Sequence, residues 1–143
     1  MTASSTRLAA CLLVLCGLLS GCISRSDEYD NPVEAQLAEL KKNQESASLS
    51  FLTDFDWDTV HFFKARTSQE QIDSVLGPGR ASAYGSADSS AKSSLVFERA
   101  GEIVEQMPLG EFALSADRVT WPHAVMAMSY GEYDLRLVEP PTR

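Results

Sequence analysis

Three aspartates and a histidine lie in one short stretch, "DFDWDTVHFF", at residues 54–63. Asp54, Asp56 and Asp58 have the spacing that opens an EF-hand calcium loop, in which carboxylate oxygens hold the ion. That loop also requires Gly at its sixth position and Glu at its twelfth, where this sequence has Thr and Ala. In an extended chain the three carboxylates stand about 6.5–7 Å apart, too far to share one ion. We therefore expect no metal and no cofactor here, and we expect the acids to face water.

Asp56, Asp58 and His61 keep a second interpretation open, in which they serve a hydrolase or a metal-dependent enzyme. An imidazole titrates near neutral pH and can act as a general acid or base. A paired-histidine metal site would need both His61 and His123, the two imidazoles of the chain. The sequence has no Walker loop, G-x-S-x-G elbow, H-E-x-x-H helix or dinucleotide fingerprint. We therefore favour a structural His61 and a protein that is not an enzyme.

Two helices are predicted from capping residues and apolar spacing. Asn31 caps the first, which begins at Pro32 and runs to the mid-40s, and Glu34 completes a capping box. Thr67 caps the second, with Glu70 closing its box. The apolar positions expected to face the core are Val33, Leu37 and Leu40 in the first helix and Ile72, Val75 and Leu76 in the second.

Strands are predicted where β-branched and aromatic residues gather between turn signals. Residues 85–94 form a Ser-rich loop, and Gly131 is the turn between the last two strands. This order of elements predicts an α+β fold, an antiparallel sheet of about four to six strands with two helices packed on one face. The predicted strands are residues 57–65, residues 80–84, the two arms of a hairpin at 94–107 that turns near Ala100 and Gly101, and a final pair at 123–130 and 132–139.

Aromatic and methionine residues in the last strands form a candidate binding face. Met and aromatic side chains that alternate along a strand are usually core, and we favour that interpretation. The alternative is a surface that binds a partner. The residues of this possible partner face are Trp121, Met126, Met128, Tyr130 and Tyr133.

The first residues point to a lipid anchor. Leu8 to Leu19 is an apolar run of about 18 Å as a helix, too short for a hydrocarbon core of about 30 Å. It ends in "LSGC", which resembles a bacterial lipobox. The resemblance implies that Cys22 receives a diacylglyceryl group and that acyl chains such as palmitate hold the protein on a membrane. The predicted organisation is a signal peptide at 1–21, the lipidated Cys22 and a polar tether at 22–31, a single domain at 32–140 and a tail at 141–143.

Charge and cysteine content agree with this organisation. The other two cysteines, Cys11 and Cys16, lie within the predicted signal, so no disulfide is expected after cleavage. The mature chain carries 20 acids and 11 bases, a side-chain charge of −9, which opposes binding to nucleic acid. We expect an extracytoplasmic lipoprotein on a cell membrane or outer membrane, with an envelope protein as partner. Ile23 after the lipidated cysteine disfavours retention at the inner membrane of a bacterium with two membranes.

Two further resemblances concern the domain itself. "FDWDTVHFF" followed by "TSQEQIDSVLG" resembles a group of small bacterial lipoproteins of unknown function, over most of residues 55–107. It implies an exported α+β domain. The segments "TSQEQIDSVLGPG" and "SLVFERAGEIVEQ" are similar to outer-membrane assembly lipoproteins of the SmpA/OmlA type and to β-lactamase-inhibitor-like folds. That similarity implies an accessory role in outer-membrane assembly.

Overall fold

The computed structural model of the chain describes residues 31–83, 92–110, 114–130 and 134–142. The predicted signal peptide, Cys22 and the tether to Asp30 lie outside these residues. None of the helices in the described ranges is long and apolar enough to cross a membrane. The elements in chain order are α1 (Pro32–Asn43), β1 (Ser46–Ser48), the 3-10 turn η1 (Leu49–Phe51), β2 (Thr59–Phe63), α2 (Gln69–Leu76), β3 (Ser93–Arg99), β4 (Glu102–Leu109), β5 (Leu114–Ser115), β6 (Thr120–Pro122), β7 (Met126–Tyr130) and β8 (Asp134–Val138).

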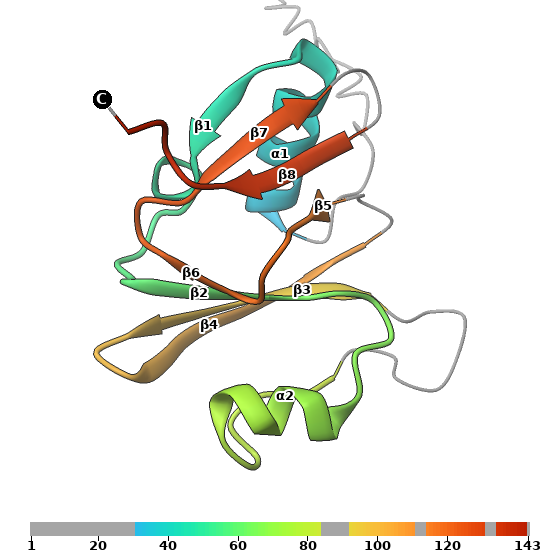
Figure 1. Cartoon of the computed structure of the whole chain (residues 1–143), viewed down its shortest axis with the longest axis vertical. Coiled ribbons are helices and arrows are strands. Elements are labelled where there is room, and N and C mark those ends of the chain that lie inside the picture. Colours follow the sequence, from blue (N-terminus) through green and yellow to red (C-terminus); the bar gives the residue numbers. More distant parts are fainter. Residues whose placement is uncertain (1–30, 84–91, 111–113, 131–133, 143) are drawn as a thin grey trace, which may run out of the picture.

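The strands form two sheets. The first sheet has the order β1-β7-β8-β5 and the second the order β4-β3-β2-β6. All pairs are antiparallel except β5 with β8. In Figure 1 the first sheet lies above the second, α1 lies behind the first sheet and α2 lies below the second. The predicted α+β fold is confirmed, but the strands divide between two sheets and each helix covers a different one.

The main core lies between α1 and the facing sides of the two sheets. Alternation along β2 sends Val60 and Phe62 into it, and their cross-strand partners Phe97 and Leu95 follow from β3. The predicted positions of the first helix are confirmed, since the residues that α1 adds are Val33, Leu37 and Leu40.

The opposite side of the second sheet packs against α2. Phe63 and Val96 form a smaller cluster there with Ile72 and Leu76 of the helix. Val75, predicted to share this apolar face, is instead 41% exposed. Around the helix, Leu76 lies on one side of Ile72 and Val75 on the other, so the sheet covers Ile72 and Leu76 and leaves Val75 at the flank.

Helix α1 is held to the second sheet through its first turn. The Asn31 carboxamide oxygen accepts a hydrogen bond from the Glu34 N–H at 2.8 Å, so the predicted cap is confirmed. The Asn31 amide group donates to the Pro108 carbonyl oxygen at 2.8 Å, and the buried Glu34 carboxylate accepts from the Gly110 N–H at 2.8 Å. The same two residues thus begin the helix and fix it to the end of β4.

Helix α2 is capped by Ser68, and the prediction of Thr67 with Glu70 was wrong by one residue. The Ser68 hydroxyl accepts from the Gln71 N–H, and the Gln71 side chain accepts from the Ser68 N–H. The Thr67 hydroxyl instead donates to the Lys64 carbonyl oxygen at 2.7 Å. Both residues are good caps, and the position of the turn after β2 decides between them.

Ser68→Ala should lower the free energy of unfolding by about 1 kcal/mol, because one orphan N–H of α2 loses its acceptor. Thr67→Ala serves as the matched control and should cost less, since its hydroxyl caps no helix. Urea unfolding followed by circular dichroism measures both. A larger loss of unfolding free energy for Thr67→Ala would indicate that Thr67 is the cap.

The predicted hairpin is confirmed as β3 and β4, and Ala100 and Gly101 at its turn have φ angles of 51° and 79°. The final pair is confirmed as β7 and β8, although Gly131 between them lies outside the described residues. The strand predicted at residues 80–84 is wrong over its described part, because residues 80 and 81 form a bend and residues 82 and 83 are irregular, while residue 84 lies outside the described ranges. Of the predicted Ser-rich loop, residues 93 and 94 belong to β3, residue 92 is irregular, and residues 85–91 lie outside the described ranges.

Candidate functional site

The aspartates of the opening stretch attach it to the turn of the β3–β4 hairpin. The Asp58 carboxylate accepts a hydrogen bond from the Ala100 N–H at 2.7 Å, and Asp56 lies 3.2 Å from the Arg99 guanidinium. Asp54, Asp56 and Asp58 are all exposed. Their predicted orientation toward water is confirmed, but the segment before Thr59 is irregular and is not part of the strand.

The apolar residues between these acids fix the entry to β2. Phe55 and Trp57 both contact the Phe97 ring edge-on, with centroids 5.1 and 5.2 Å apart. The Trp57 indole N–H donates to the Thr53 hydroxyl at 2.9 Å, and the His123 ring lies 4.7 Å from the indole. Packing of the aromatic rings therefore explains the alternating pattern of this stretch.

The enzyme interpretation placed Asp56, Asp58 and His61 in one site, and the structure gives them different partners. The two aspartates bind the hairpin turn, whereas His61 is buried and bonds to Thr120 and Glu98. Within the described residues, no three His, Cys, Asp or Glu side chains lie close enough together to hold a metal ion.

Asp58 makes one part of the acid sensitivity of the fold predictable. The hydrogen bond from Ala100 N–H is the largest cause that lowers the pKa of Asp58 below its ordinary value, and a bond from Thr59 adds to it. A depressed folded-state pKa means stability that is fully present above the unfolded-state pKa, about 3.9. That stability decreases as the pH falls further and is gone below the folded-state pKa.

Asp58→Asn should therefore flatten the loss of stability below about pH 4, compared with the unaltered protein. Urea midpoints measured between neutral pH and acid pH test this. Asp54→Asn is the matched control, because Asp54 is an exposed neighbour in the same stretch. If the urea midpoint falls equally with pH in the unaltered protein and in Asp58→Asn, the role of the Ala100 bond is contradicted.

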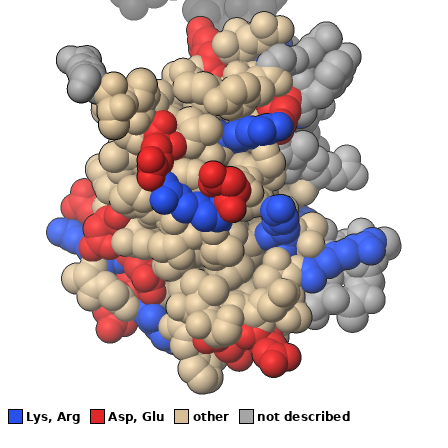
Figure 2. Space-filling view, in the orientation of Figure 1, with Lys and Arg blue, Asp and Glu red and all other residues tan. Residues whose placement is uncertain are grey.

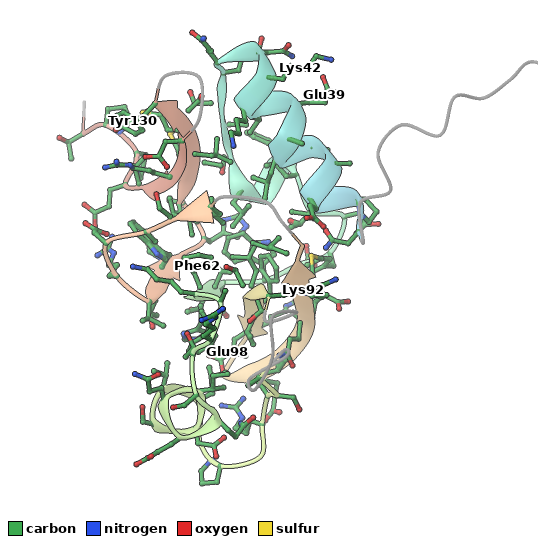
Figure 3. All side chains as sticks on the ribbon, turned by 90° about the vertical axis from the view of Figure 1, so that its right-hand side faces the viewer. Glu39, Lys42, Phe62, Lys92, Glu98 and Tyr130 are labelled. Atoms are coloured by element: carbon green, nitrogen blue, oxygen red, sulfur yellow. The ribbon has the colours of Figure 1, made fainter. Side chains whose placement is uncertain are left out.

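His61 is the centre of a chain of polar side chains on the α2 side of the second sheet. Its Nδ1 lies 2.9 Å from the Thr120 hydroxyl and its Nε2 lies 3.1 Å from Glu98 Oε2. Glu98 Oε1 lies 3.0 Å from the Arg80 guanidinium, which also donates to the Leu76 carbonyl oxygen. Figure 3 shows Glu98 on the side of the sheet toward α2 and Phe62 between the two sheets.

This chain of contacts holds α2 on the sheet. The His61 and Glu98 side chains are 6% and 14% exposed, so their mutual bond is shielded from water. Burying them is tolerable because each polar atom has a partner, and no buried side-chain nitrogen or oxygen of the described residues lacks one. An imidazole between a hydroxyl and a carboxylate is also an arrangement that moves protons in enzymes. Here Arg80 closes the carboxylate end, and the exposed Thr120 forms the other end.

Sequence reasoning missed Glu98, Thr120 and Arg80. Glu98 is 37 positions and Thr120 is 59 positions from His61, so no local motif joins them. The available signal was a polar residue on each of two apolar strands, "TVHFF" and "SSLVFER". Antiparallel pairing of those strands brings the polar positions to one face.

The residues of the possible partner face separate into two groups. Val125 and Ala127 point into the core, so Met126, Met128 and Tyr130 lie on the opposite, outer face of the first sheet. The two methionines are partly buried and Tyr130 is 50% exposed, which corrects our preference for core at these positions. Tyr133 lies outside the described residues.

Trp121 belongs to the core and not to this face. It is 1% exposed, and its indole N–H donates to the Arg118 carbonyl oxygen at 3.0 Å. The Arg118 guanidinium lies 4.2 Å from the centre of the ring and covers it. Strand β6 is the edge strand of the second sheet, in which Trp121 pairs with Val60 of β2.

A groove of about 380 Å³ lies between the end of β2, helix α2 and residues 116–119. The buried residues Phe62 and Phe63 line it, together with the partly exposed Val75 and Val119. The ring of Phe63 stacks 6.4 Å from that of His61, so the groove adjoins the polar chain described above.

The resemblances of residues 55–107 to small bacterial lipoproteins, and of the α2–hairpin region to the SmpA/OmlA type, remain predictions. The site is defined by its geometry: a polar chain at His61, an outer sheet face at Tyr130 and a groove beside α2. No protein-family model matches this chain, and no curated protein and no solved structure matches it either.

Proposed function

We propose that this chain is a bacterial cell-envelope lipoprotein whose folded domain binds or stabilises another envelope component and catalyses no reaction. The observation that carries the proposal is the sequence "LSGC" at residues 19–22, directly after a short apolar run. Acyl groups on Cys22 attach the protein firmly when two or more chains are present, because each buried methylene contributes about 0.8 kcal/mol.

The tether sets how far the domain extends from the membrane. Nine residues separate Cys22 from Pro32, where α1 begins. The ten Cα–Cα steps from Cys22 to Pro32 span at most about 36 Å, so α1 starts within that distance of the lipid. The acid excess of the domain discourages direct adsorption to anionic headgroups, which favours a domain held near the membrane and available to a protein partner.

The outer face of the first sheet is the surface that we propose for this partner. Met126, Met128 and Tyr130 share it, and the Arg136 guanidinium lies 5.3 Å from the centre of the Tyr130 ring. Tyr and Arg are enriched among residues that dominate binding energy at interfaces. Figure 2 shows the front of the molecule, where basic and acidic side chains lie side by side in the middle with uncharged surface around them, and further acidic ones lie to the left and below.

A photo-crosslinking residue at Tyr130, introduced into the full-length lipoprotein in its native cell, should give one discrete adduct. The same residue at Glu39 on α1 is the control, because that exposed position lies on a different surface. We expect the adduct from Tyr130 only, and Met128→Asp should abolish it. Equal adducts from both positions would contradict this face as the binding surface.

The same experiment bears on the SmpA/OmlA-like alternative. An outer-membrane assembly protein in the Tyr130 adduct would support an accessory role in assembly. A partner of another class would favour the broader proposal over this alternative.

A second candidate function is an acid–base enzyme, and the Thr120–His61–Glu98 chain is the observation that favours it. The three side chains would act together, with Asp56 and Asp58 outside the site. Hydrolysis of nitrophenyl esters by the purified lipoprotein, lost in His61→Gln, would support the enzyme. No turnover, or turnover that is the same in His61→Gln, would favour a structural role for the Thr120–His61–Glu98 contacts.

A further inference from the structure

The groove beside α2 opens where two segments stop pairing. Strands β2 and β6 are in register from Thr59 to His61, and the Phe62 N–H then donates to the Val119 carbonyl oxygen at 2.8 Å. Beyond that bond, residues 116–119 form one wall of the groove and α2 forms the other. The groove is therefore an extension of an existing strand pairing.

Apolar side chains are left in water on both walls of this groove. Val75 on α2 is 41% exposed and Val119 is 38% exposed, and they are two of the few large apolar residues of the described chain with this much exposure. Phe62 and Phe63, 2% and 4% exposed, form the floor between them. An apolar side chain of a ligand placed here would rest on the two phenylalanines and gain from removing Val75 and Val119 from water.

Basic residues outnumber acidic ones in the groove, which is the reverse of the whole chain. Lys64 and Arg118 line it with a single acid, Asp117, whereas the chain has 20 acids and 12 bases. Arg118 is already engaged, because its guanidinium contacts Glu139 and lies over Trp121. In the described part of the chain no acceptor binds the Lys64 ammonium group, so Lys64 is the cation that a ligand can use.

We propose that this groove binds an extended segment of a partner protein in which a carboxylate side chain lies two positions from an apolar one. The apolar side chain enters between Val75 and Val119, and the carboxylate pairs with Lys64. Side chains of an extended segment alternate in direction, so residues two positions apart face the groove together while the residue between them points away. A long acyl chain requires a deeper apolar cavity, since 380 Å³ is at the low end for ligand sites.

The probes are dye-labelled pentapeptides with Leu-Ala-Glu or Glu-Ala-Leu at the centre, added to the full-length lipoprotein in detergent. Fluorescence anisotropy should show binding with Kd on the order of 0.1–1 mM. Replacing Glu by Gln in the peptide, or Lys64 by Gln in the protein, should weaken binding about five-fold, because one charge-assisted contact is lost. Val75→Ser should weaken it by a similar factor.

Two matched variants serve as controls. Val104→Ser alters a valine with the same 41% exposure on β4, and Lys42→Gln alters an exposed lysine on α1. Neither should change the affinity by more than about two-fold. Asp117→Asn should strengthen binding of the acidic peptides, since it removes a like charge from the groove.

Several outcomes would overturn the inference. They are no binding of either acidic peptide, equal binding of the Gln peptides, or an equal effect of Val104→Ser and Val75→Ser. Displacement of the peptides by palmitate, weakened by the same substitutions, would show an amphiphile site instead of a peptide site. Acylation of Cys22 and the Tyr130 adduct are measured separately, so failure here leaves the proposed function intact.

Discussion

Cys22→Ala should abolish acylation of this protein and leave a precursor that retains residues 1–21. On the lipobox resemblance we propose that the Cys22 sulfur accepts the diacylglyceryl group, and alanine has no atom that can form that bond. Metabolic labelling with an alkyne fatty acid, followed by gel fluorescence, measures the label. We expect complete loss in the variant and a slower-migrating band for the uncleaved chain.

Cys16→Ala is the matched control, because Cys16 lies six residues earlier within the predicted signal. It should leave both the label and the processing unchanged. Label that persists in Cys22→Ala, or that is lost in Cys16→Ala, would contradict the assignment of the anchor. A protein that is exported and cleaved but never labelled would be an ordinary secreted domain.

Trp121→Ala should lower the free energy of unfolding by about 3–5 kcal/mol. The ring is buried in the main core and its indole N–H is bonded to the Arg118 carbonyl oxygen, so the substitution leaves a cavity and an unpaired acceptor. The guanidinium of Arg118 also loses the aromatic surface that it covers. Urea unfolding, with unfolding enthalpy from calorimetry as a second readout, gives the value.

Tyr130→Ala is the comparison that separates core from partner face. Its ring is half exposed, and the loss of stability should stay within about 1 kcal/mol. A small effect of Trp121→Ala together with a large one of Tyr130→Ala would reverse our assignment of the two aromatics. Trp121→Phe should recover part of the stability, because most of the ring volume returns.

Local signals in the sequence predicted the elements whose contacts are also local. The cap at Asn31, the apolar positions of α1 and the hairpin at Ala100 and Gly101 depend on residues a few positions apart, and all are confirmed. The division into two sheets depends on pairings between distant segments. β1 is "SAS", which has no strand propensity, and it is a strand because β7 lies beside it.

The errors at α2 have a similar cause. Thr67 and Ser68 are both suitable caps by residue type, and the turn after β2, in which the Thr67 hydroxyl bonds to the Lys64 carbonyl oxygen, leaves Ser68 as the cap. The helix has only eight residues, so two apolar side chains reach the sheet and Val75 faces the groove. The candidate sites at His61 and in this groove need the tertiary fold, which brings Glu98 and Thr120 to His61.

Mass spectrometry of the N-terminal peptide of the mature protein tests the lipoprotein proposal most directly. The protein is purified from its native membrane in detergent, digested, and its lipid-bearing peptide sequenced by fragmentation. We predict a chain that begins at Cys22 and carries a diacylglyceryl group on the sulfur. A mature chain that begins at any other residue, or that begins at an unmodified Cys22, would contradict the proposal.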